Sequence, residues 1–128
     1  MTLGMVQFGS ERLQDAQNSM QQAVTLSRKN KERQFEVISR LWLGRIVGKR
    51  DMSQSGKAEK DILQGIKACE EEKLKPFLAQ GYLFLGELYG NRKQPDKALE
   101  KLKKAEGMFQ EMGMDYWLGK TQDILERL

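Results

Sequence analysis

An internal repeat constrains the fold of this chain more than any other feature of its sequence. The segment "FEVISRLWLGRIVG", residues 35–48, aligns with "FLAQGYLFLGELYG", residues 77–90, at an offset of 42 residues (77 − 35). The identical positions in this alignment are Phe35/Phe77, Leu41/Leu83, Leu43/Leu85, Gly44/Gly86 and Gly48/Gly90. A chain that repeats a short unit folds as a stack of similar elements, so the repeat favours an array over a single irregular core.

The residues that follow each copy repeat as well, with helical spacing. Ala58 and Ala98 correspond at an offset of 40 residues, and Ala16 precedes Ala58 by 42. Ala98 and Ala105 are seven residues apart and therefore lie on one face of a helix. Two helices in each unit of about 40 residues are typical of a helical solenoid. The sequence therefore predicts an all-α fold of antiparallel helix pairs.

Local signals set the expected boundaries of the helices. Pro76 and Pro95 suit first turns, because the N–H that proline lacks would be unpaired there. Gly113 can end one helix in the left-handed conformation, and Asp115 can cap the next. Residues 1–9 are interpreted as a loose lead-in to a single domain over 10–128. Six helices are expected, over residues 10–30, 33–49, 55–73, 76–91, 95–112 and 115–128.

The two ends of the array are expected to differ from the repeats 33–73 and 76–112. The helix over 10–30 has no preceding partner, so we interpret it as the second helix of a truncated repeat. Its apolar face would then be exposed, with Leu13, Met20 and Val24. The helix over 115–128 carries Glu126 where the repeats have glycine, as expected of a terminal capping helix.

Glycine inside the first helix of each repeat indicates close helix packing. Gly44 and Gly86 each cost about 1 kcal/mol relative to alanine in a helix, so a packing reason is expected. We expect them where the first helix crosses the second, with Ala98 and Ala105 as the matching small surface opposite Gly86. Tyr82, Leu85, Tyr89 and Leu102 would supply the bulk around that crossing.

Composition argues against several functional classes. The chain has 128 residues, with 31% charged and 39% hydrophobic residues, and no histidine. Without histidine, a histidine-based triad or proton shuttle is impossible, so we expect no enzyme, no metal site and no cofactor. Cys69 is the only cysteine and is expected to be packed. The net charge of +4 is spread among acidic residues, and no apolar run reaches the length of a membrane span, so we expect neither a nucleic-acid partner nor a membrane.

The repeat pattern resembles the tetratricopeptide signature, an aromatic-x2-L-G-x2-Y helix followed by A-x3-large-x2-A. The matching residues are Tyr82, Leu85, Gly86, Tyr89, Ala98, Leu102 and Ala105, with a weaker copy at Leu43 and Gly44. This resemblance implies a right-handed α-solenoid that binds other proteins. The longer period and the ending "MFQEMGMDYWLGKTQDILERL" resemble the C-terminal arrays of large bacterial signalling proteins that carry a nucleotide cyclase or kinase-like domain and an ATPase module. That resemblance implies a cytoplasmic bacterial protein of which this chain is a fragment.

The resemblance also implies that the first helices of the pairs line a concave groove. The residues carried over to that groove are Leu41, Trp42, Arg45, Lys49, Gln80, Leu83, Phe84, Glu87, Asn91, Lys120, Asp123 and Arg127. Trp42 and Phe84 are the leading candidates, and the alternative is that both are core residues between neighbouring pairs. Ile38 and Trp42 occupy two positions of the lysine and asparagine pattern that clamps a C-terminal carboxylate in some members, so that ligand is not expected.

These observations favour a non-catalytic interaction module, with a regulatory or scaffold role, that holds a peptide or helix of another protein. A homodimerisation module is the alternative, followed by a helical domain that binds nucleic acid. The residues leave open the partner, the pathway, the oligomeric state, the domains that precede the array and whether Met1 is the native start.

Overall fold

The computed structural model describes the backbone of residues 2–128 and the side chains of residues 12–128. The described residues form helices and no strand, which confirms the all-α expectation. The elements are α1 (Thr2–Lys29), α2 (Arg33–Arg50), the short 3-10 helix η1 (Met52–Gln54), α3 (Ser55–Glu71), α4 (Lys75–Asn91), α5 (Pro95–Met112) and α6 (Asp115–Glu126). The six predicted helices are therefore present, and most of their ends lie within two residues of the predicted positions.

The N-terminal boundary of α1 differs most from the prediction. The helix begins at Thr2, so the loose lead-in expected over residues 1–9 is helical from Thr2 onward. No proline occurs between Thr2 and Lys29, and each residue added to an existing helix gains a backbone hydrogen bond. Because no proline stops the helix in this segment, α1 extends through it although the apolar pattern of the segment is weak.

Four of the connections between consecutive α-helices contain the same tight turn. In the turn between α3 and α4, the N–H of Lys73 donates to Glu70 O at 3.3 Å and that of Leu74 donates to Cys69 O at 2.9 Å. This pair of bonds satisfies carbonyl groups that the end of a helix leaves unpaired. The residues with positive φ in these turns are Lys31 (60°), Lys73 (58°), Lys93 (60°) and Gly113 (69°). The prediction for Gly113 is confirmed, and the three lysines take a conformation that glycine adopts more easily.

The predicted cap of the last helix is wrong. Asp115 is the first residue of α6, Met114 precedes the helix, and no side chain caps it. The turn after α5 explains this shift, because the N–H of Met114 bonds to Phe109 O at 2.9 Å and so fixes Met114 between the two helices. Asp115 still lies in the first turn, where a negative charge interacts favourably with the helix dipole. Pro76 and Pro95 lie in the first turns of α4 and α5, as predicted.

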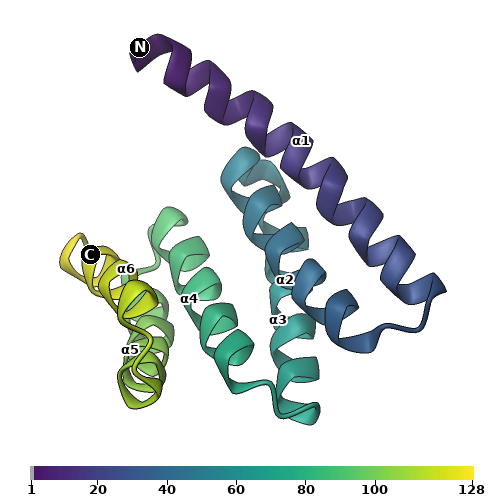
Figure 1. The fold of residues 1–128 in the computed structure, drawn as a ribbon. Helices are drawn as coiled ribbons and strands as arrows, with labels where there is room; N and C mark the ends of the chain where they lie inside the picture. Colours follow the sequence, from purple (N-terminus) through teal and green to yellow (C-terminus); the bar gives the residue numbers. More distant parts are fainter. Residues whose placement is uncertain (1) are drawn as a thin grey trace.

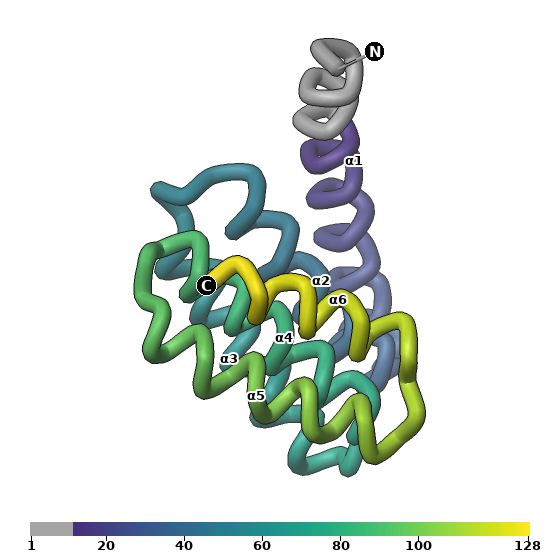
Figure 2. Tube along the Cα trace, turned by 90° about the vertical axis from the view of Figure 1, so that its left-hand side faces the viewer, coloured from purple at the N-terminus to yellow at the C-terminus, as the bar shows by residue number. Residues whose placement is uncertain are grey.

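The helices pack in neighbouring pairs, and α1 and α6 lie at opposite ends of the row (Figure 1). Contacts also join α2 to α4 and α4 to α6, whereas the described residues of α1, α3 and α5 make no such contacts with one another. Figure 2 shows α5 and α6 side by side at their end of the row. The layer of α2, α4 and α6 is therefore the more closely packed side of the molecule.

Gly44 and Gly86 lie where the first helix of each pair meets the second, as predicted. A Cβ atom on Gly44 would lie 2.7 Å from Ile62 Cγ1, and one on Gly86 would lie 2.6 Å from Leu102 Cγ. Ile62 and Leu102 are fully buried and occupy equivalent positions of the repeat, so the same contact is made twice. Ala98 and Ala105 are fully buried as well. The small residues therefore allow close helix approach, and a leucine or isoleucine fills the space that each glycine leaves.

The exposed apolar face predicted for the first helix is wrong. Val24 is buried, and Leu13 and Met20 are half-buried on the side of α1 that packs on α2. Within residues 12–29, these apolar residues form one stripe, and this part of α1 packs on α2. The exposed residues of α1 are mostly polar, namely Arg12, Asp15, Asn18, Ser19, Gln21, Gln22, Thr25, Leu26, Arg28 and Lys29. The part of α1 over residues 12–29 therefore presents a mostly polar surface.

Over the described part of the chain, no helix combines the length and the hydropathy that crossing a lipid bilayer would require.

Candidate functional site

A groove runs along the layer formed by α2, α4 and α6. It consists of two adjoining cavities, of about 350 Å³ and about 170 Å³, which share Lys49, Glu87, Ile124 and Arg127 in their walls. The full lining is Arg45, Lys49, Leu83, Glu87, Gly90, Asn91, Lys120, Asp123, Ile124, Arg127 and Leu128. Because the lining comes from all three helices, we call this feature the α2–α4–α6 groove.

The structure brings together most of the predicted groove residues. Those that line the α2–α4–α6 groove are Arg45, Lys49, Leu83, Glu87, Asn91, Lys120, Asp123 and Arg127. Leu41 and Phe84 are each 1% exposed and Gln80 is 7% exposed, so these side chains offer almost no surface to a partner. Leu83 contributes a wall to the groove although its side chain is also 1% exposed.

Some lining residues were missed at the level of sequence. Gly90 is one of the repeated glycines, so its position in both copies was a usable signal. Ile124 and Leu128 are four residues apart in the sequence, and their apolar side chains were equally consistent with core packing.

Glu87 joins α2 to α4 in the middle of the groove. Its Oε1 lies 3.2 Å from Arg45 Nε, and its Oε2 lies 3.5 Å from Lys49 Nζ. The side chains of Arg45 and Glu87 are each 15% exposed, whereas that of Lys49 is 40% exposed. Both oxygens of Glu87 are therefore engaged within the protein, and Lys49 keeps part of its surface open to the groove.

An aromatic cluster of Trp42, Phe84 and Trp117 lies beside this ion pair. The ring centroids are 5.0 Å apart for Trp42 and Phe84, 6.1 Å for the two tryptophans and 6.3 Å for Phe84 and Trp117, all with edge-to-face geometry. The guanidinium of Arg45 lies 5.1 Å from the Trp42 ring and 4.6 Å from the Phe84 ring. The cluster thus fixes Arg45, and Phe84 fits the core alternative better than a binding role.

The α6 side of the groove carries charges without ion partners. Lys120 Nζ lies 5.4 Å from the Tyr116 ring, which is its one described side-chain interaction. Asp123 and Arg127 form no side-chain hydrogen bond or ion pair within residues 12–128. These side chains are exposed and remain available to a partner.

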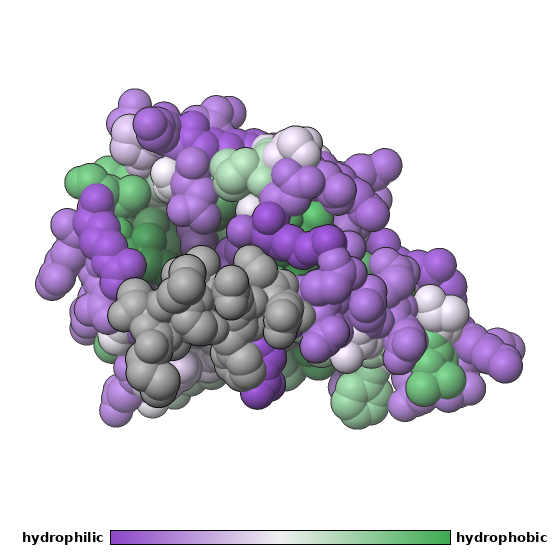
Figure 3. Space-filling view, turned by 90° about the horizontal axis from the view of Figure 1, so that it is seen from above, coloured by the Kyte–Doolittle hydropathy of each residue, from purple (hydrophilic) through white to green (hydrophobic). Residues whose placement is uncertain are grey.

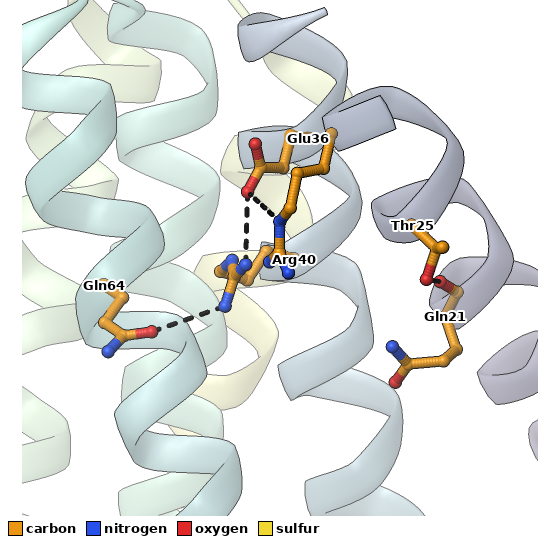
Figure 4. Close-up of polar contacts among 6 residues, drawn as sticks. Gln21, Thr25, Glu36, Arg40 and Gln64 are labelled. Atoms are coloured by element: carbon orange, nitrogen blue, oxygen red, sulfur yellow. Dashed lines mark hydrogen bonds and ion pairs between the residues drawn. The ribbon is translucent and has the colours of Figure 1, made fainter. Parts of the chain in front are cut away.

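A second polar network lies away from the groove and joins α1, α2 and α3 (Figure 4). Glu36 Oε2 lies 3.3 Å from Arg28 Nε and 3.2 Å from an Arg40 guanidinium nitrogen, and Arg40 donates to Gln64 Oε1 at 3.5 Å. Its charges are paired across helices, which indicates a structural role. Asp61, on the same helix as Gln64, has one buried oxygen without a hydrogen bond, and burial raises the pKa of this carboxyl.

Cys69 is fully buried, as predicted, and burial raises the pKa of its thiol to about 11. The thiol is therefore protonated at neutral pH, which makes it a packing residue. The surface seen from above in Figure 3 is mostly hydrophilic, with hydrophobic residues in small separate groups.

Comparisons with protein-family models, with curated proteins and with solved structures found no match to this chain.

Proposed function

We propose that this chain is a non-catalytic interaction module, a tetratricopeptide-like right-handed solenoid that holds a peptide or helix of another protein in the α2–α4–α6 groove. The position of that groove is the observation that carries the proposal. It lies on the closely packed layer made by the first helix of each pair, and it gathers charged side chains from three helices. A groove built by several rigid helices suits recognition of an extended or helical segment.

The charged lining supports binding better than catalysis. The chain has no histidine, and the carboxylate of Glu87 is held by Arg45 and Lys49. A carboxylate whose two oxygens are both held by cations of the protein has no unoccupied oxygen to present to a substrate. The exposed side chains of Asn91, Lys120 and Arg127 are, by contrast, suited to polar contacts with a bound chain.

We further place the module in the cytoplasm, within a larger bacterial signalling protein such as a nucleotide cyclase. This placement rests on the resemblance of the long repeat period and of the last helix to the C-terminal arrays of such proteins. In that setting, the module would recruit or position a regulatory partner.

A random peptide library displayed on phage tests the binding function. The immobilised chain is expected to select peptides that bind with a Kd in about the micromolar range, as is usual for short segments. Asn91→Trp fills the groove from the end of α4 and is expected to weaken binding of these peptides by about tenfold or more. Gln110→Trp, at an exposed position of α5, is the matched control and is expected to leave their affinity unchanged.

Two results would contradict the proposal. The library could yield no binder, or the selected peptides could bind the Asn91→Trp chain as tightly as the parent.

Self-association is the second candidate function, and exposed apolar residues near α6 favour it. Tyr116 is 67% exposed and Leu128 is 45% exposed. A second copy that packs on this edge would cover both side chains.

A further inference from the structure

The side chains that line the α2–α4–α6 groove carry unequal charge. Arg45, Lys49, Lys120 and Arg127 are cationic, whereas Glu87 and Asp123 are anionic. The formal charge of the lining is therefore positive. The partial negative charge at the C-terminal end of α6 offsets part of this excess, but its effect is confined to the last turn, and Lys120 lies outside that turn.

The ion pairs within the groove do not involve the cationic side chains of α6. Arg45 and Lys49 share the two oxygens of Glu87, at 3.2 Å and 3.5 Å. Neither Lys120 nor Arg127 has a carboxylate partner within the described side chains, and both are exposed. An incoming carboxylate would therefore meet two cations without having to break an ion pair of either.

The spacing of these two cations sets the spacing of the groups that they can bind. Lys120 and Arg127 are seven residues apart and line the same groove. Seven residues of helix rise about 10 Å. In a polyproline II chain, side chains three residues apart lie on the same face and cover a similar distance of about 9 Å.

We infer that the groove selects an acidic segment of its partner protein, an inference that rests on the proposed function. Such a segment presents one carboxylate to Lys120 and a second to Arg127, while the side-chain amide of Asn91 bonds to its backbone. Charge complementarity of this kind gives specificity and a faster encounter. A nucleic acid fits less well, because Asp123, which lies between Lys120 and Arg127 in the sequence, would oppose a continuous phosphate backbone.

The sequences selected from the random library provide the first test. Binders enriched in Asp and Glu relative to the unselected library support the inference. Neutral or basic binders overturn it but leave the proposed function standing, whereas a library without binders overturns both.

Charge reversal provides the second test, with a selected peptide labelled with fluorescein as the probe. Arg127→Glu and Lys120→Glu are each expected to weaken binding by about tenfold, and Lys103→Glu, at an exposed position of α5, is expected to leave it unchanged. Replacement of the acidic residues of the peptide by Gln is expected to cause a similar loss. Equal affinity of the parent, R127E and K120E chains would overturn the inference. A labelled single-stranded oligonucleotide that binds more tightly than the peptide would also overturn it.

Discussion

Two glycines inside helices show how the surroundings of a residue decide the effect of a substitution. A Cβ on Gly86 would lie 2.6 Å from Leu102 Cγ, whereas one on Gly107 would have no neighbour within 4 Å. Gly107→Ala is therefore expected to stabilise the protein by about 1 kcal/mol through helix propensity alone. Gly86→Ala is expected to destabilise it, and Gly86→Leu to cost about 3 kcal/mol by overpacking.

Thermal unfolding of these variants checks this prediction. Each 1 kcal/mol shifts the melting temperature of a domain of this size by about 4 °C. A Gly86→Leu variant that melts within about 2 °C of the parent would contradict the close helix contact at this position.

The lysines in the tight turns carry a conformational cost that glycine avoids. Lys93 has φ of 60°, in the left-handed region that costs an L-residue about 1–2 kcal/mol. Lys93→Gly is therefore expected to stabilise the protein by about 1 kcal/mol, and Gly113→Ala, at φ of 69°, to destabilise it. Lys97→Gly, inside α5, is the control and is expected to destabilise by about 1 kcal/mol. Urea unfolding measures all three, and a destabilised Lys93→Gly variant would contradict the prediction.

The partly buried carboxyl of Asp61 is expected to make the stability of the protein depend on pH. Burial raises the pKa of its carboxyl in the folded state above 3.8, although Arg40 acts in the opposite direction. The folded state therefore binds this proton more tightly than the unfolded state, and the contribution of Asp61 to stability falls as the pH rises through the raised pKa. Asp61→Asn is thus expected to be more stable than the parent at neutral pH, with a gain that shrinks as the pH falls toward 3.8.

Urea unfolding of the Asp61→Asn chain at about pH 7 and about pH 4 measures this difference. Asp15→Asn, at an exposed position of α1, is the control and should show no such trend. A gain that is equal at both pH values would contradict the assignment of the effect to this carboxyl.

At the scale of the elements, the aromatic cluster links α2 to α6 across α4. These two helices share no close backbone contacts, yet the Trp42 and Trp117 rings are 6.1 Å apart. A double-mutant cycle with Trp42→Leu and Trp117→Leu is expected to give a coupling energy of about 1 kcal/mol. The pair Tyr82→Leu and Trp117→Leu, which have no ring contact, should be additive. If the effects of the two tryptophan substitutions on stability are additive, the contact between the two rings is contradicted.

The helix boundaries show which local signals are readable in the sequence. Pro76, Pro95 and Gly113 act through their own backbone geometry, so their positions were predicted correctly. The polar hinge "KRDMSQSGK" is two residues longer than its counterpart "NRKQPDK", and the structure fills it with η1, where Asp51 accepts a bond from Ser53 N at 2.9 Å. Lys31, Lys73 and Lys93 were missed because lysine has no preference for their conformation.

At the scale of the whole molecule, we expect a monomer in solution. Over the described side chains of α1, residues 12–29, the exposed residues are mostly polar, so this part of the helix offers little apolar surface to a second copy. Equilibrium sedimentation over a wide concentration range should therefore give a mass near 14.8 kDa. A dimer would favour self-association, and Leu128→Glu would then show whether the α6 edge forms the interface.

The periodicity predicted which helix faces meet, but it could not predict how deeply each residue is buried. Phe84 was a leading candidate for binding because the tetratricopeptide resemblance implies a groove position for it and a rigid aromatic ring supplies binding area. Its burial depends on Trp117, which arrives from α6 and packs with a centroid distance of 6.3 Å. The spacing of residues within one repeat cannot predict this contact, because Trp117 lies outside that repeat. Arg45, Lys49 and Glu87 were found through the groove positions that the resemblance implies, and their long charged side chains reach the surface there.

The aromatic cluster also makes the chain its own optical reporter. Trp42 and Trp117 are the two tryptophans of the sequence, their rings lie 6.1 Å apart, and the Arg45 guanidinium lies 5.1 Å from the Trp42 ring. Intrinsic tryptophan emission therefore originates from one place, on the layer that carries the groove. A molecule that enters the groove, or a loosening of α6, should shift or quench that emission without any added dye, whereas rearrangements confined to α1 should leave it unchanged.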